Sequence, residues 1–193
     1  MHEMDSIQDH SLSRRFALLA LLLVLLPVST QAAGVIIEKA STRLQNSIYQ
    51  LNANINYELS DAVLEALNNG IAVTMQLSIK IEQPRSYLWD ELIAEKSQRY
   101  ELKFHALSGQ YLVKTNTGEQ RSYLSLTTAL RGLGQIRALP ILDQALLQDP
   151  QDVMVRLKTE LDTNALPAPL RPVAWLSSEW KLSSEWYSCP LRY

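Results

Sequence analysis

Apolar and polar residues alternate almost without a break along two stretches of the chain, residues 49–59 and residues 71–81. A period of two is typical of a β-strand that buries one face and leaves the other in water. Between them, residues 60–67 have the composition of a short helix, which Ser60 or Asp61 can cap and an Asn-Asn-Gly sequence ends. The pattern therefore predicts a strand, a helix and a second strand in succession.

The same alternation predicts further strands over residues 35–44, 100–106, 111–113, 153–161 and 180–187, and helical spacing predicts a second short helix over 127–133. Residues 87–98 fit a helix or an irregular strand equally well. Residues 166–172 contain three prolines and predict an irregular connector. Half-exposed strands with few helices indicate a mainly β fold, an antiparallel sandwich or strongly twisted sheet with two short helices.

The two predicted helices share features that suggest an internal repeat of hairpin, helix and strand. Aligning the two regions gives three identities, Tyr57 with Tyr123, Leu64 with Leu130 and Leu67 with Leu133. Each helix then leads through glycine into a segment that begins with isoleucine. The alternative is that these matches are coincidental.

The N-terminal region has the three parts of a secretory signal peptide. Arg14 and Arg15 supply positive charge, residues 16–26 form an apolar run of 11, and small residues follow Pro27. The run is far shorter than the roughly 20 apolar residues that a spanning helix needs. We expect the general secretory route, with a twin-arginine signal, an uncleaved anchor or a buried helix as alternatives.

Cleavage near Ala32 or Ala33 would define two parts of the chain. Residues 1–32 would be the signal peptide, and residues 33–193 would form a single β-rich domain, which is an ordinary size for one domain. We therefore expect a periplasmic protein that keeps no stable membrane span after cleavage.

The chain after the leader is almost neutral, with 16 basic and 17 acidic side chains. Because the sequence shows no basic patch that could neutralise phosphates, we expect no nucleic-acid partner. Cys189 is the one cysteine, so no disulfide can form within the chain. We expect it to be a small apolar residue near the C-terminus, with an intermolecular disulfide or a reactive thiol as the alternatives.

Few residues suited to catalysis remain after the leader. His105 is the single histidine there and lies on the polar side of its predicted strand, so we expect no zinc site built from histidine and cysteine. The common nucleophile, phosphate-binding and dinucleotide motifs are missing, and we predict no catalytic residue, no metal and no cofactor. A hydrolase could still use paired carboxylates, for which the candidates are Asp90, Glu91, Glu95, Asp149 and Asp152.

Three of the four tryptophans lie near the C-terminus. Trp180 and Trp186 would share one face of the strand predicted over residues 180–187. Together with Trp175 they could form an aromatic platform for a ligand or a protein partner. The alternative is that the rings fill a core that contains few phenylalanines.

Several segments taken together carry a family resemblance, namely residues 57–60, 65–71, 129–134, 161–162, 166–172 and 180–186. The chain resembles the DUF4390 family of proteobacterial exported proteins over essentially its whole length after the leader. The resemblance implies an envelope location and no established activity. Because members of the family are often encoded beside a sensor histidine kinase of the nitrogen-regulatory type, it also implies a periplasmic accessory role in signalling, and it assigns no functional residues.

These observations lead to one expected function and two alternatives. We expect a non-enzymatic periplasmic binding or accessory module, linked to envelope signalling through a partner such as an inner-membrane sensor kinase. The first alternative is a carboxylate-dependent hydrolase of the envelope. The second is a structural envelope protein with a stable partner, for which exposed strand edges would be suited.

Overall fold

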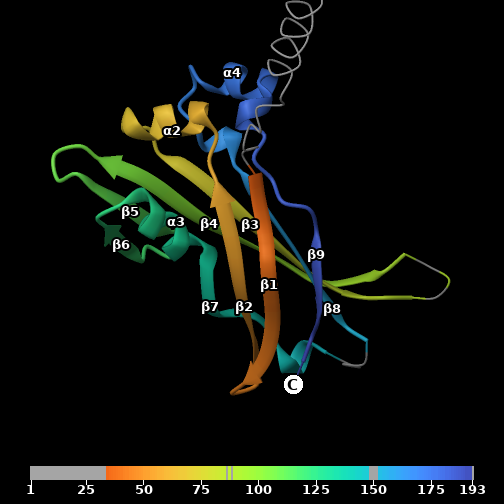
Figure 1. The fold of residues 1–193 in the computed structure, drawn as a ribbon. Coiled ribbons are helices and arrows are strands. Elements are labelled where there is room, and N and C mark those ends of the chain that lie inside the picture. The colour runs from red at the N-terminus through yellow and green to blue at the C-terminus, as the bar shows by residue number, and fades with distance from the viewer. Residues whose placement is uncertain (1–33, 86, 88, 148–151, 193) are drawn as a thin grey trace, which may run out of the picture. The chain divides into compact units, whose positions relative to one another are not determined.

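The computed structural model describes residues 34–85, 87, 89–147 and 152–192 (Figure 1). Within these residues the strands are β1 (Gly34–Gln45), β2 (Ile48–Glu58), β3 (Val73–Gln83), β4 (Glu91–His105), β5 (Gln110–Thr115), β6 (Gln120–Tyr123), β7 (Gln135–Asp143), β8 (Met154–Leu161) and β9 (Tyr187–Pro190). The helices are α2 (Asp61–Asn68), α3 (Leu126–Gly134) and α4 (Arg171–Leu176), with 3-10 turns η1 (Gln144–Leu146), η2 (Thr163–Ala165) and η3 (Ser178–Trp180). The predicted leader lies outside the described residues and stays a prediction.

The strands form two antiparallel sheets of unequal width (Figure 1). The three-stranded sheet has the order β1-β2-β7, and the six-stranded sheet has the order β6-β5-β4-β3-β8-β9. All strand pairs within both sheets are antiparallel. The prediction of a mainly β, antiparallel fold with few short helices is confirmed.

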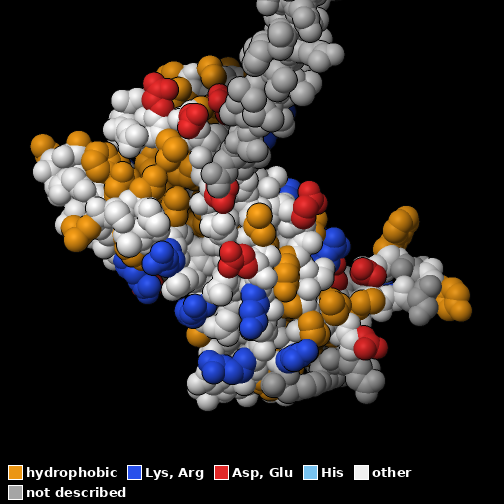
Figure 2. Space-filling model, in the orientation of Figure 1, with side chains coloured by type: hydrophobic (Ala, Val, Ile, Leu, Met, Phe, Trp, Pro, Cys, Tyr) orange, Lys and Arg blue, Asp and Glu red, His pale blue; other side chains and the backbone are white. Residues whose placement is uncertain are grey.

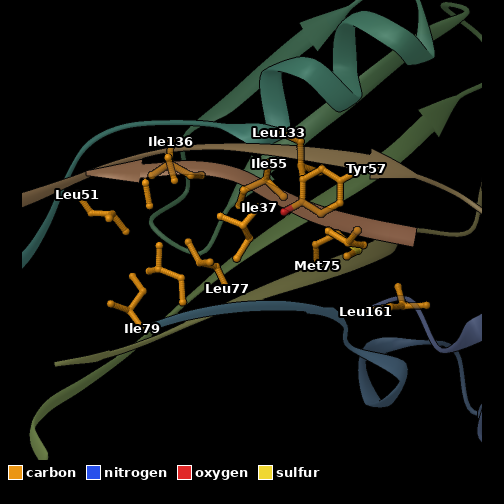
Figure 3. Close-up of a cluster of buried hydrophobic side chains, with 14 of the residues drawn as sticks. Ile37, Leu51, Ile55, Tyr57, Met75, Leu77, Ile79, Leu133, Ile136 and Leu161 are labelled. Atoms are coloured by element: carbon orange, nitrogen blue, oxygen red, sulfur yellow. The ribbon is translucent and has the colours of Figure 1, made fainter. Parts of the chain in front are cut away.

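The core lies between the two sheets, where alternating side chains of both meet (Figure 3). Its labelled members are Ile37, Leu51, Ile55, Tyr57, Met75, Leu77, Ile79, Leu133, Ile136 and Leu161. Full burial of one such aliphatic side chain stabilises the fold by about 1.5–3 kcal/mol. The alternation of apolar and polar residues in β2 and β3 therefore reflects this packing, because one face of each strand is buried between the two sheets.

Both predicted helices begin at the serine expected to cap them. The Ser60 hydroxyl accepts a hydrogen bond from the Val63 amide, and the Ser125 hydroxyl accepts one from the Thr128 amide. Gly70 follows α2 in the left-handed region, with φ of 78°, as expected for a glycine beyond a helix end.

Each of these two helices carries the chain from one sheet to the other. Helix α2 joins β2 of the three-stranded sheet to β3 of the six-stranded sheet, and α3 joins β6 back to β7. The order hairpin, helix, strand thus occurs twice, as the repeat hypothesis requires. The strand pairing differs between the two occurrences, because β7 pairs directly with β2, whereas β4 and β5 separate β3 from β6, the strand that corresponds to β2.

Of the sequence predictions for the C-terminal region, one was wrong, one holds in part, and an open one is settled. The predicted connector is irregular over residues 166–170, but its last two residues begin helix α4, because Pro172 occupies the first turn, where no amide hydrogen is needed. The strand expected over residues 180–187 is instead the turn η3, an isolated bridge from Ser183 to Glu160, and β9. The ambiguous residues 87–98 contain the first half of β4.

A buried polar contact links the two sheets near the C-terminal segment. The hydroxyl groups of Tyr57 on β2 and Thr159 on β8 lie 3.2 Å apart. The Thr159 amide donates to the Ser184 hydroxyl at 3.0 Å, and the Ser184 amide donates to the Thr159 carbonyl at 2.8 Å. Thr159 therefore holds the last segment of the chain against the core.

Tyr57 is expected to make the domain lose stability in alkaline solution. Burial raises the pKa of Tyr57 above its ordinary value of 10.0, while its hydrogen bond with Thr159 lowers it. The folded state therefore holds the Tyr57 proton more tightly than the unfolded state does. The contribution of Tyr57 to the free energy of unfolding is complete below pH 10, and above pH 10 it falls by about 1.4 kcal/mol per pH unit. Tyr57→Phe should cost about 1 kcal/mol at neutral pH through the lost hydrogen bond.

Urea unfolding of both proteins at about pH 8 and about pH 11 measures this difference. The Tyr57→Phe protein should lose about 1 kcal/mol less than the wild type over that interval. Equal losses for the two proteins would show that Tyr57 does not keep its proton preferentially in the folded state.

Candidate functional site

The structure does not place the three C-terminal tryptophans on one surface. Trp180 in η3 is 5% exposed, whereas Trp175 in α4 is 57% exposed and Trp186 is 38% exposed. The paired positions Glu160–Ser183 and Leu157–Tyr187 differ in register by one residue. A one-residue shift moves the following side chains to the opposite face of a sheet, and Trp180 lies in the turn η3 before any pairing begins, so the strand face predicted to carry both Trp180 and Trp186 does not form.

Trp186 instead lies beside two cationic side chains of the neighbouring strands. The Lys80 ammonium is 5.5 Å from its ring centroid, and the Arg156 guanidinium carbon is 5.1 Å from it. These distances are in the range of cation–π interactions. Arg156 also forms an ion pair with Glu82 at 3.3 Å. Trp186 is therefore part of a charged cluster on the outside of the six-stranded sheet.

Trp175 and Trp180 still share one feature, a depression of about 430 Å³ beside α4. Trp180 forms its buried wall, and Trp175 is more exposed to solvent. The turn η3, which contains Trp180, is held against α2, because the Ser60 hydroxyl donates a hydrogen bond to the Glu179 carbonyl at 2.6 Å. The two rings could contact one bound group, but they are not the most exposed aromatic side chains of the described chain.

The most exposed aromatic residues lie in the turn between β3 and β4. Tyr87 is 99% exposed and Trp89 is 92% exposed, and Leu92 on the adjoining strand is also exposed. The β3–β4 hairpin carries this turn beyond the paired part of the sheet, and hydrophobic surface is visible there at the right of the space-filling view (Figure 2). We call Tyr87, Trp89 and Leu92 the hairpin tip.

The hairpin tip combines these apolar side chains with local charge. Arg85 forms an ion pair with Glu91 across the base of the turn, where β3 and β4 pair through Gln83 and Glu91. Asp90 is exposed next to Trp89. Exposed apolar side chains that lie close together often mark a site of interaction with another molecule.

Sequence reasoning missed the hairpin tip, although a signal was present. Pro84 marks the end of the alternation of β3, and Tyr87 and Trp89 follow it in a stretch with no period. Turns are usually polar, so aromatic residues a few positions after a strand-ending proline indicate an exposed functional turn.

The candidate carboxylates and His105 do not form a common site among the residues that the structure describes. Asp90, Glu91 and Glu95 follow one another along the hairpin, Asp152 precedes β8, and Asp149 lies outside the described residues. His105 is exposed and its Nδ1 lies 3.0 Å from the Ser108 hydroxyl.

Cys189 is buried, and burial raises the pKa of its thiol. In the part of the chain that the structure covers, no group of three or more His, Cys, Asp or Glu side chains could hold a metal ion. Among the same residues, no helix has the length and hydrophobicity needed to cross a bilayer.

Comparison with known proteins gives one match. A family model described as a domain of unknown function (DUF4390) matches residues 32–190 and covers most of the chain. No curated protein and no solved structure matches this chain. The resemblance seen in the helix caps, glycines and C-terminal motifs is confirmed, and the chain belongs to the DUF4390 family.

Proposed function

We propose that this chain is a non-enzymatic accessory module of the bacterial envelope that binds a protein partner through the hairpin tip. The observation that supports the proposal is the almost complete exposure of Tyr87 and Trp89 at the end of a long hairpin. Tyrosine and tryptophan are the residues that most often contribute the binding energy of a protein interface. Each would bury a large apolar area in a complementary pocket.

The charges at the hairpin tip favour a protein over a lipid surface. Arg85 is already paired with Glu91, and Asp90 adds a further negative charge. Anionic lipid surfaces attract lysine and arginine and repel carboxylates. An aromatic pair next to carboxylates therefore suits a protein pocket with a basic rim, where the charges also direct the approach of the partner.

The proposed partner is an inner-membrane protein, such as the sensor kinase that the family resemblance suggests. A periplasmic module with an exposed aromatic hairpin could bind the outward-facing domain of such a protein. The tip is a compact anchor, so a few residues would determine most of the affinity.

A crosslinking experiment in intact cells tests the proposal. A photo-reactive amino acid replaces Tyr87 in the full-length chain, and the same replacement at Leu107 serves as the control. Leu107 is 96% exposed and lies in the turn at the other end of β4. We expect a defined inner-membrane protein to be crosslinked from position 87 and not from position 107.

Trp89→Ala should then lower the yield of that crosslink by about tenfold or more, because loss of a central aromatic anchor has an effect of this size. Leu107→Ala should leave the yield unchanged, and neither substitution should move the unfolding midpoint, because both side chains are exposed. Crosslinks to lipid alone, or equal crosslinks from both positions, would contradict the proposal.

A further inference from the structure

The unequal width of the two sheets leaves part of the six-stranded sheet without a partner sheet. Strands β1, β2 and β7 lie against one side of it, and α3 contacts β5 and β6 beyond them. A cavity of about 440 Å³ remains between the inner face of β4–β6 and the chain from Gly132 to Pro140. We call it the β4–β6 cavity.

The inner face of the sheet changes character where the cavity begins. On β3, Leu77 and Ile79 are fully buried, yet their direct partners on β4 are Gln98 and Lys96. Next to them, Thr115 on β5 pairs with Tyr100. Strand positions that would be apolar in a closed sandwich are therefore polar or cationic at this place.

The charges around the cavity are predominantly positive. Lys96, Arg121 and Arg137 line it, against the single carboxylate of Glu119. Arg121 forms an ion pair with Glu119 at 2.6 Å. Among the described residues, Lys96 and Arg137 have no carboxylate within ion-pair distance. Two positive charges thus remain available to a bound anion.

Neutral groups hold these two cations at the mouth of the cavity. The Lys96 ammonium donates to the Pro140 carbonyl at 2.5 Å, and the Arg137 guanidinium donates to the Asn54 side-chain carbonyl at 3.0 Å. Each cation keeps further donors free to point elsewhere. In the space-filling view, lysine and arginine side chains also gather on the side of the molecule below α3 (Figure 2), which would attract anions toward this side.

The other walls provide apolar surface and a neutral donor. Val113 and Ile136 are buried, and Leu139 is half-buried. Burial and the nearby Glu119 carboxylate raise the pKa of Tyr100 to about 12, so its hydroxyl stays protonated and can donate a hydrogen bond. The adjoining Ala138 has a positive φ of 48°, a conformation that costs energy for a residue other than glycine.

From this arrangement we propose that the β4–β6 cavity binds a small organic anion with an apolar body. Its carboxylate, sulfonate or phosphate group meets Lys96 and Arg137, and its apolar part lies against Val113, Ile136 and Leu139. The volume is within the range of small-molecule sites, about 300–1,000 Å³. The inference is independent of the proposed function, because no residue of the hairpin tip lines this cavity.

Two fluorescent probes with the same ring skeleton test the proposal on the purified protein. 1-Anilinonaphthalene-8-sulfonate carries one negative charge, and N-phenyl-1-naphthylamine lacks it. We expect saturable binding of the sulfonate and at least several-fold weaker binding of the neutral probe. Raising the salt concentration should weaken the binding of the sulfonate only, since salt screens the charge interaction. This comparison requires no substitution, so it does not depend on the folding of a variant.

Substitutions then locate the site. Arg137→Gln and Lys96→Gln should each weaken sulfonate binding several-fold and leave the neutral probe unaffected. Lys103→Gln is the matched control, because Lys103 lies on the same strand as Lys96 but does not line the cavity. Equal binding of the two probes, no saturable binding of the sulfonate, or an equal effect of Lys103→Gln would overturn the proposal.

Discussion

Gly134→Ala is expected to destabilise the domain by about 3 kcal/mol, because it forces the backbone of two packed elements apart. A Cβ atom at Gly134 would overlap the carbonyl oxygen of Ile55 on β2. The position of the Cβ atom is fixed by the backbone, and the oxygen is itself a backbone atom, so neither can rotate away. Helix α3 must therefore move off the three-stranded sheet. The gain in helix propensity from alanine, about 1 kcal/mol, cannot offset this. Urea unfolding followed by tryptophan fluorescence measures the change.

Gly132→Ala is the matched control on the same helix. Its Cβ atom would overlap the ring end of Tyr123, which is half-buried and can shift. We therefore expect a loss of less than about 1.5 kcal/mol, partly offset by the higher helix propensity of alanine. Equal losses for the two variants would mean that the contact between Gly134 and Ile55 does not limit the packing of α3.

The second large effect is expected for Trp180→Ala, which should cost about 3–5 kcal/mol. The ring is 5% exposed, and η3, which contains it, contacts both α2 and α4. Its removal leaves a cavity that the fixed turn cannot fill. Thermal or urea unfolding provides the measurement.

Trp175→Ala provides the comparison, since Trp175 lines the same depression but is 57% exposed. It should cost less than about 1 kcal/mol. A large loss for Trp175→Ala and a small one for Trp180→Ala would reverse the roles that the structure gives to the two rings.

Much of the fold could be predicted because alternation is a local consequence of burial. Tyr49, Leu51 and Leu77 are buried at the spacing that predicted their strands. The helix caps Ser60 and Ser125 could be identified because a capping hydroxyl and its amide lie three residues apart in the sequence.

The candidate sites could not be predicted in the same way, because each depends on how distant elements meet. The period of two placed Trp186 with Trp180, but Trp180 lies in the turn η3 and the pairing with β8 shifts by one residue before Trp186. The inward direction of Lys96 and Gln98 follows from alternation on β4. These side chains reach an open cavity because the opposing sheet has only three strands and leaves this part of the wider sheet uncovered. No local sequence pattern encodes the width of the opposing sheet.

The chain passes from the three-stranded sheet to the six-stranded sheet and back, and this path determines the order in which the two sheets can be completed. Synthesis proceeds from the N-terminus, and the early hairpin β1–β2 forms its sheet only with β7, which comes much later in the chain. Likewise β3, at the centre of the wider sheet, gains its second neighbour only when β8 has been made. Such pairings between distant segments form slowly. A growing chain therefore contains no complete sheet until most of it has emerged, although neighbouring strands such as β1–β2 and β3–β4 can pair earlier.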